Sequence, residues 1–256
     1  MIRLAGKMLW ALRHPRSAVR NMVGRARYPA YKYCVGPPEM YEALGLYQFE
    51  LLKACGLRPN HSLLDIGCGS LRAGKFFVRY LDTGNYAGIE PNRQILEEGI
   101  RHNLDRRTAE EKKPSFSNDD EFTLSVFNRR FDFLLAHSIL THAPQQQIER
   151  CFVEARQVMT ATSLFLANYN KGESDYSGTN WISPGGHHDG CFHGAVTYRF
   201  ACISSLAQRA DFQCAELDVV HPTGSSWVVL GEPGCLHSLE REIDSHRFSL
   251  ARNVTA

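Results

Sequence analysis

A glycine-rich turn behind a short apolar segment constrains this chain more than any other feature. Residues 63–69 read Leu-Leu-Asp-Ile-Gly-Cys-Gly, and Glu90 stands 21 positions after Gly69, behind a second apolar segment at 86–89. An apolar segment that ends in Gly-x-Gly predicts a buried strand that turns sharply into a helix. Glycine permits positive φ and close approach of a ligand, and an acid after the next strand can accept hydrogen bonds from ribose hydroxyls. The pair therefore predicts a nucleoside-bearing cofactor across two adjacent parallel strands.

Two residues of this turn distinguish between two classes of cofactor. Dinucleotide sites need a third glycine at the sixth motif position, where the pyrophosphate meets the helix. Here that position is Arg72, whose side chain would crowd a pyrophosphate. Asp65 would repel a pyrophosphate but suits a ligand with a positive amine. S-adenosylmethionine carries an ammonium group and a sulfonium and no phosphate, so the turn favours this cofactor.

Residues 64–70, Leu-Asp-Ile-Gly-Cys-Gly-Ser, resemble motif I of the class I S-adenosylmethionine-dependent methyltransferases, and Glu90 matches the acidic ribose ligand of that family. The resemblance covers residues 60–232 and implies an enzyme that uses S-adenosyl-L-methionine. It also implies an α/β, Rossmann-like, doubly wound sheet of seven strands, mostly parallel with a C-terminal antiparallel hairpin. One position departs from the pattern, because many members have glycine where Leu71 stands.

The resemblance also predicts where the cofactor is held. The segment 115–120 predicts a short third strand followed by an acid, and Asp119 is expected to accept the exocyclic amine of adenine. Asp120 is the alternative, and a solvated turn rich in Asn and Asp is the interpretation without a ligand. The residues predicted to bind the cofactor are Asp65, Gly67, Cys68, Gly69, Ser70, Glu90, Pro91, Asn118, Asp119, Ala136 and His137.

The apolar periodicity predicts an alternating α/β chain. Helices are expected at 39–56, 71–82, from Pro91 to 100, 144–160 and 198–210, and strands at 62–66, 85–90, 115–118, 131–136, 163–168, 213–220 and 226–231. Residues 101–113 are highly charged and have no apolar period, so they predict an exposed connection. The predicted domain organisation is a basic arm at 1–38, a methyltransferase domain at 39–232 with a helical cofactor cover at 39–60 and a core at 61–232, and a polar tail at 233–256.

The N-terminal arm carries lysine and arginine but no acid before Glu39. Such a basic, partly amphipathic segment can lie on anionic lipid. A mitochondrial presequence and a solvated or partner-packed arm are the alternatives. The net charge of the whole chain is only +2, which does not favour a nucleic-acid partner. We therefore expect a small-molecule acceptor, with peripheral membrane or partner contact through the arm, and leave the oligomeric state open.

The cysteines indicate the compartment. The chain has 8 of them, without Cys-x-x-Cys or the spacing of a disulfide scaffold. Their distribution fits a reducing cytoplasm, and no apolar segment of about twenty residues predicts a membrane span. The loop at 185–194 holds several His, Cys and Asp residues, but their irregular spacing predicts no metal site.

Methyl transfer to a hydroxyl requires an aligned nucleophile and a base that removes its proton. His137 and His142 follow the fourth strand, and His188 lies in the glycine-rich loop after the fifth, so these three are the catalytic candidates. The Asn/Asp-Pro-Pro-aromatic motif of amide- and adenine-methylating relatives is absent. This pattern resembles the branch of the family that methylates small molecules at oxygen, carbon or amine. The resemblance further implies a small metabolite as the acceptor, and O-methylation of a sugar or natural-product-like hydroxyl is expected. The alternatives are a nicotinamide-dependent oxidoreductase and a non-catalytic cofactor-binding adaptor that docks through its basic arm.

Overall fold

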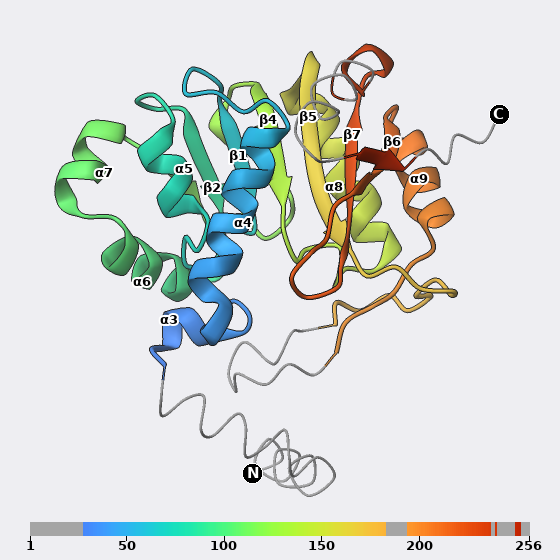
Figure 1. Cartoon of the computed structure of the whole chain (residues 1–256), viewed down its shortest axis with the longest axis horizontal. Coiled ribbons are helices and arrows are strands. Elements are labelled where there is room, and N and C mark those ends of the chain that lie inside the picture. The colour runs from blue at the N-terminus through green and yellow to red at the C-terminus, as the bar shows by residue number, and fades with distance from the viewer. Residues whose placement is uncertain (1–27, 183–193, 237–238, 240–248, 252–256) are drawn as a thin grey trace, which may run out of the picture.

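The computed structural model describes residues 28–182, 194–236, 239 and 249–251 (Figure 1). These residues form a single mixed sheet with helices on both faces. The strands lie in the order β3 (Ser115–Ser117), β2 (Tyr86–Ile89), β1 (Leu63–Ile66), β4 (Phe131–Ala136), β5 (Met159–Tyr169), β7 (Ser226–Gly231), β6 (Gln213–Asp218) and β8 (Ser249–Ala251).

The predicted doubly wound sheet is confirmed. Strands β3, β2, β1, β4 and β5 are parallel, and β7 pairs antiparallel with both β5 and β6. The short strand β8 adds an edge that the sequence analysis did not predict, where Leu250 pairs with Leu217 of β6. The order of the strands reverses between β1 and β4, and open α/β sheets bind ligands at the carboxyl ends of the strands at such a point.

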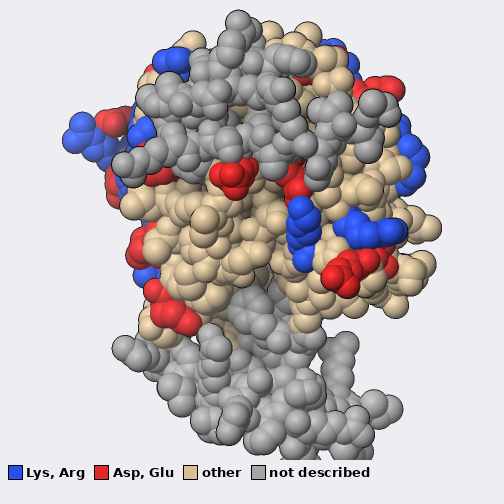
Figure 2. Space-filling model, turned by 45° about the vertical axis from the view of Figure 1, so that its right-hand side comes forward, with Lys and Arg blue, Asp and Glu red and all other residues tan. Residues whose placement is uncertain are grey.

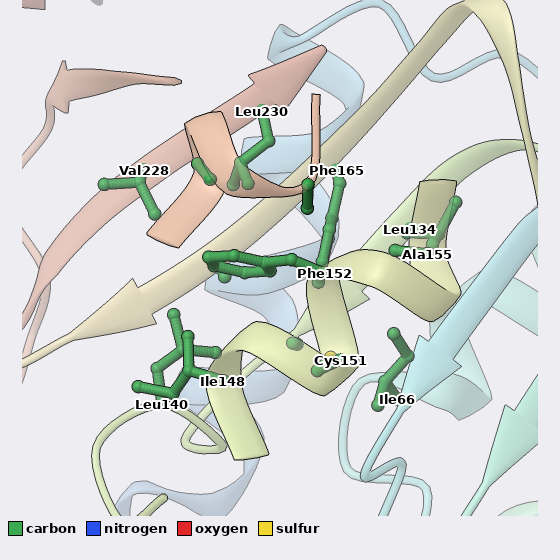
Figure 3. Close-up of a cluster of buried hydrophobic side chains, with 14 of the residues drawn as sticks. Ile66, Leu134, Leu140, Ile148, Cys151, Phe152, Ala155, Phe165, Val228 and Leu230 are labelled. Atoms are coloured by element: carbon green, nitrogen blue, oxygen red, sulfur yellow. The ribbon is translucent and has the colours of Figure 1, made fainter. Parts of the chain in front are cut away.

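Helices α4 (Tyr41–Ala54) and α5 (Gly74–Tyr80) pack on one face of the sheet, and α8 (Gln145–Val158) and α9 (Phe200–Arg209) pack on the other. Figure 3 shows Cys151, Phe152 and Ala155 of α8 directed toward the strand residues that they cover. The rings of Phe152 and Phe165 meet edge to face, with centroids 5.8 Å apart. Burial of each such ring contributes about 2–3 kcal/mol, which explains why periodicity alone locates this helix.

Residues 101–113 are mostly exposed, as predicted, but most of them are helical, so the prediction of a connection without regular structure was wrong. Helix α6 (Arg93–Asn103) is followed by α7 (Arg106–Lys112). The Asp105 carboxylate accepts the N–H of Thr108 at 2.8 Å and caps α7, and Arg106 pairs with Glu110 one turn later. Polar pairs of this kind contribute about 0.2–0.5 kcal/mol each. A helix stabilised in this way has no apolar face, so the periodicity of apolar residues in the sequence does not predict it.

The glycine turn after β1 lies between two helices that touch its backbone. A Cβ on Gly45 of α4 would lie 2.2 Å from the carbonyl oxygen of Arg72, and a Cβ on Gly99 of α6 would lie 2.5 Å from Cα of Ser70. The backbone of Leu71 is left-handed, with φ of +60°. Glycine adopts this conformation most readily, which gives a physical reason for the glycine that the motif I resemblance implies at this position. The turn is thus fixed from both sides.

The described surface carries mixed charge. On the face shown in Figure 2, blue and red side chains lie near one another over a largely uncharged surface. Exposed ion pairs such as Arg209–Glu149, at 2.6 Å, connect neighbouring elements. No helix within the described part of the chain is long and apolar enough to cross a bilayer.

Candidate functional site

A cavity of about 670 Å³ opens at the carboxyl ends of β1, β2 and β4. Cavities of about 300–1,000 Å³ hold cofactors and small ligands. One part of its wall is the glycine turn with the residues that follow β2 and β3. A second part comes from Ser138–His142, Trp181 and the turn before β7. Residues 30–37, around α3 (Ala30–Tyr33), form a third part.

Most of the predicted cofactor residues line this cavity. They are Asp65, Gly67, Cys68, Gly69, Glu90, Pro91, Asp119 and His137, together with the alternative Asp120. Pro91 precedes the start of α6 rather than occupying its first turn, because Asn92 is the N-cap and its side chain accepts the N–H of Ile95 at 3.2 Å. The roles of these residues in binding remain predictions.

Glu90 is held by two backbone groups. Gly69 N–H donates to Oε2 at 3.1 Å, and Asn92 N–H donates to Oε1 at 2.8 Å. Burial raises the pKa of Glu90, and these two hydrogen bonds oppose the rise. Each carboxylate oxygen has a further lone pair. The side chain can therefore accept two more hydrogen bonds, as a ribose with two hydroxyls would require.

Three predicted cofactor residues lie outside the cavity lining. The hydroxyl of Ser70 is fully buried and donates to the carbonyl oxygen of Tyr31 at 2.6 Å. The side-chain amide of Asn118 donates to the carbonyl oxygen of Glu90 at 2.8 Å, and Ala136 is fully buried in β4. Ser70 and Asn118 thus use their polar groups within the protein. They brace residues that do line the cavity.

Asp119 forms the turn that the sequence analysis kept as its alternative. Its Oδ1 accepts the N–H of Glu121 at 3.1 Å and of Thr123 at 2.6 Å. This atom has a structural task, although Asp119 still borders the cavity. Asp120 is exposed at the same wall. The choice between the two as adenine ligand therefore stays open.

Asp65 lies at the base of the cavity and accepts a hydrogen bond from the Tyr86 hydroxyl at 2.8 Å. Burial raises the pKa of Asp65 to about 7, while the hydroxyl and the Arg72 guanidinium oppose this rise. A buried carboxyl with such a pKa favours a cationic neighbour, because a cation restores its ionised form.

His137 is engaged at both ring nitrogens. Its Nδ1 lies 2.9 Å from Nη2 of Arg72, and its Nε2 lies 2.9 Å from Nε2 of His221. A guanidinium has no acceptor atom, so Arg72 must donate this hydrogen bond. Nδ1 is therefore the acceptor, which places the His137 proton on Nε2, facing His221. Burial and Arg72 hold the pKa of His137 well below its usual value. This geometry suits a positioning residue better than a base.

His142 has the opposite arrangement. Its Nδ1 and the neighbouring hydroxyl of Thr141 are buried and have no hydrogen-bond partner among the described residues, although both residues line the cavity. Burial lowers the pKa of His142 to about 4, and hydrogen bonding of the ring to the backbone of Ile182 and Gly194 opposes this fall. The imidazole is therefore neutral at physiological pH, and no described group forms a hydrogen bond with its Nδ1.

Two strand-like contacts fix this segment. Ile182 N–H donates to the carbonyl oxygen of His142 at 2.9 Å, and Val196 N–H donates to that of Thr141 at 2.8 Å. The predicted catalytic residue His188 lies outside the described residues, between these two anchors in sequence. Its role stays a prediction.

Several cavity residues were not among the predicted site residues. They include Arg72, Thr141, Asn170, Trp181, Thr223, Ser225 and most of residues 30–37, a segment predicted to belong to the basic arm. One signal could have located Thr223 and its neighbour His221. An antiparallel strand beside β5 must begin where β5 ends, so the turn before β7 lies at the ligand-binding edge, as the pairing of Tyr169 with Ser226 shows.

No protein-family profile matches the chain. Over 134 residues the chain is 25% identical to the sterol 24-C-methyltransferase erg6 of Aspergillus fumigatus, which covers 52% of this chain. The matched part is 34% of that protein, so the chain spans about a third of the length of this curated relative.

Solved structures of methyltransferases share the fold. The magnesium protoporphyrin IX methyltransferase of Synechocystis, with bound S-adenosylmethionine, superposes with a TM-score of 0.56 at 12% identity and covers 86% of this chain and 91% of its own. An S-adenosylmethionine-dependent methyltransferase of Clostridium acetobutylicum gives a TM-score of 0.54 at 12% identity, covering 86% and 99%. The fold implied by the motif I resemblance is therefore confirmed.

Proposed function

We infer that this chain is a class I S-adenosylmethionine-dependent methyltransferase, and we propose that it methylates a hydroxyl group of a small molecule. The observation that carries the proposal is the Glu90 carboxylate, held by Gly69 and Asn92 at the edge of the cavity where the strand order reverses. The fold and the cofactor bound in the Synechocystis structure support the choice of S-adenosylmethionine.

The charges of the cavity fit this cofactor. Five carboxylates line it, from Asp65, Glu90, Glu98, Asp119 and Asp120. When bound, S-adenosylmethionine supplies an electrophilic methyl group on a positive sulfonium. Glu90 would accept hydrogen bonds from the ribose hydroxyls, and Asp119 or Asp120 would accept one from the adenine amine. Asp65 would lie near the ammonium group.

His142 is the proposed base. Its unpaired Nδ1 would accept the proton of the acceptor hydroxyl, which makes the oxygen nucleophilic. The hydroxyl of Thr141 would help to orient the acceptor. The contacts of His137 with Arg72 and His221 use both of its ring nitrogens and support His142 over His137 in this role.

Several other lining residues on this side are neutral and polar or aromatic. Asn170, Trp181 and Thr223 offer hydrogen-bonding groups and one large ring face. Such a wall supports a sugar or natural-product-like hydroxyl compound as the acceptor, since rings stack and hydroxyls pair with amide and hydroxyl groups.

Calorimetry with S-adenosylmethionine and S-adenosylhomocysteine tests the cofactor. We expect micromolar or tighter binding of both to folded protein, whereas binding of NADH alone would favour the oxidoreductase alternative. Incubation with methyl-labelled cofactor and a fractionated small-molecule extract then tests the reaction. A labelled methyl ether supports the proposal, and label on nitrogen or carbon would contradict O-methylation.

Membrane contact through residues 1–38 is a separate prediction. Residues 1–27 lie outside the described part of the chain. Cosedimentation with vesicles that contain phosphatidylserine, compared with neutral vesicles, tests this contact. Cofactor binding without turnover on any extract, together with arm-dependent sedimentation, would favour the adaptor alternative.

A further inference from the structure

Arg72 is the only lysine or arginine that lines the cavity within the described part of the chain. We propose that Arg72 forms a subsite for the carboxylate of the cofactor's amino-acid end, so that the cavity selects a zwitterion rather than any adenosine thioether. This inference rests on the proposed function. It gives Arg72 a ligand-binding role at the position where a dinucleotide site would have its third glycine.

The guanidinium is held by neutral groups. Nη1 donates to the carbonyl oxygen of Val35 at 2.7 Å, and Nη2 donates to Nδ1 of His137 at 2.9 Å. Nε is buried without a hydrogen-bond partner among the described residues. A guanidinium has five N–H donors, so these two contacts fix its orientation and leave donors for a ligand.

The charge of Arg72 is not neutralised by an ion pair with any described residue. The residue is only 8% exposed, and a buried charge without a partner is costly. Burial lowers its pKa to about 10, at which the group is still charged at neutral pH. An incoming carboxylate would supply the missing negative charge and can accept two N–H groups from one guanidinium.

The position of Asp65 supports the same conclusion. Arg72 and Asp65 influence each other electrostatically, since each opposes the shift that burial imposes on the pKa of the other. The carboxylate and ammonium groups of an α-amino acid are attached to one carbon atom. A cationic and an anionic side chain that line one cavity and influence each other electrostatically match that arrangement, whereas 5′-methylthioadenosine would bring no charged group to either.

The test compares S-adenosylmethionine with its decarboxylated form, which keeps the adenosine, the sulfonium and the amine. In calorimetry we expect the wild-type protein to bind S-adenosylmethionine about 10- to 100-fold more tightly. In Arg72→Gln this preference should shrink to about twofold, with little change for the decarboxylated compound. Arg209→Gln, on the exposed Glu149 pair, is the control and should keep the wild-type preference.

The outcomes are distinguishable. Equal wild-type affinities for the two compounds would overturn the carboxylate subsite and leave the proposed function standing. Failure of both compounds to bind would overturn the proposed function and this inference with it. If Arg72→Gln does not fold, Arg72→Lys keeps the charge but not the planar fork, and should retain only part of the preference. Full preference in either folded variant would overturn the assignment to Arg72.

Discussion

The backbone N–H of Gly69 donates a hydrogen bond of 3.1 Å to Oε2 of Glu90. The contact joins the turn after β1 to the end of β2, two sites that lie 21 residues apart in the chain. Because β1 and β2 are parallel neighbours, their carboxyl ends meet at one edge of the sheet. The spacing of the glycine turn and the acid, which predicted the site, is thus the length of one strand–helix–strand crossover.

Replacement of Glu90 by Gln should weaken the binding of S-adenosylhomocysteine by about 10- to 100-fold. The amide is the same size but has one oxygen, so its NH₂ group would face the N–H of either Gly69 or Asn92. Calorimetry measures the loss. Glu97→Gln, on the exposed Arg93 pair of α6, is the matched control and should bind as the wild type does. Unchanged affinity in Glu90→Gln would place the ribose elsewhere.

Asp65 should make the protein less stable as the pH rises. Its pKa is about 7 in the folded protein, against about 3.9 in the unfolded chain. Between these values the folded state holds a proton that the unfolded state has released. The contribution to stability is therefore complete below about pH 4 and is lost as the pH rises through 7, at up to about 1.4 kcal/mol per pH unit.

Urea unfolding at intervals from pH 5 to 8 measures this dependence. The Asp65→Asn variant should show a flatter curve, and the difference between the two proteins isolates Asp65 from the buried histidines. Those histidines act in the opposite direction. Because the pKa values of His142 and His221 are lowered to about 4, their contribution to the stability of the protein is lost as the pH falls. A difference that does not change with pH would contradict the raised pKa.

The sequence predicted those parts of the fold that follow from local chemistry. Buried parallel strands are apolar on both faces, and helix α8 has a clear apolar stripe. Helix α7 was not predicted, because its stability comes from an N-cap and charged pairs instead of an apolar face. Strand β8 pairs with β6 over only three positions, which is too short for an alternating pattern.

The site was only partly predictable for a different reason. His137 and His221 are 84 residues apart, and their contact exists only because β7 returns beside β5. The sequence predicted both His137 and His142 as catalytic candidates, with His137 at the more favourable depth. Their difference lies in which ring nitrogens other groups occupy, and that depends on Arg72 and on the turn before β7.

Replacement of Gly99 by Ala should destabilise the protein even though alanine is the better helix former. Helix propensity favours alanine by about 1 kcal/mol. The new Cβ, however, would lie 2.5 Å from the backbone of Ser70, which must then move. We expect a net loss of about 1–3 kcal/mol in urea unfolding, with weaker binding of S-adenosylhomocysteine because the glycine turn is displaced.

Gly234→Ala is the control for this substitution. A Cβ at Gly234 would meet no atom within 4 Å, so this variant should be as stable as the wild type or slightly more stable. Equal stability of Gly99→Ala and Gly234→Ala would show that α6 can move away from the turn without cost.

Replacement of His142 by Gln should separate catalysis from cofactor binding. Loss of a general base lowers kcat by about 10²- to 10⁴-fold, whereas the affinity for S-adenosylhomocysteine should stay within about threefold of the wild type. His137→Gln should weaken cofactor binding more than it lowers kcat, because His137 accepts a hydrogen bond from the Arg72 guanidinium and orients it. Its main effect is expected on cofactor affinity.

The pH profile of the wild-type enzyme provides an independent readout. Since burial lowers the pKa of His142 to about 4, kcat/KM for the acceptor, measured with the cofactor saturating, should stay level as the pH falls from 8 to about 5 and should drop only near the pKa. A base with an ordinary imidazole pKa would give an acid limb near pH 6.5. An acid limb there, or full activity in His142→Gln with none in His137→Gln, would transfer the role of the base away from His142.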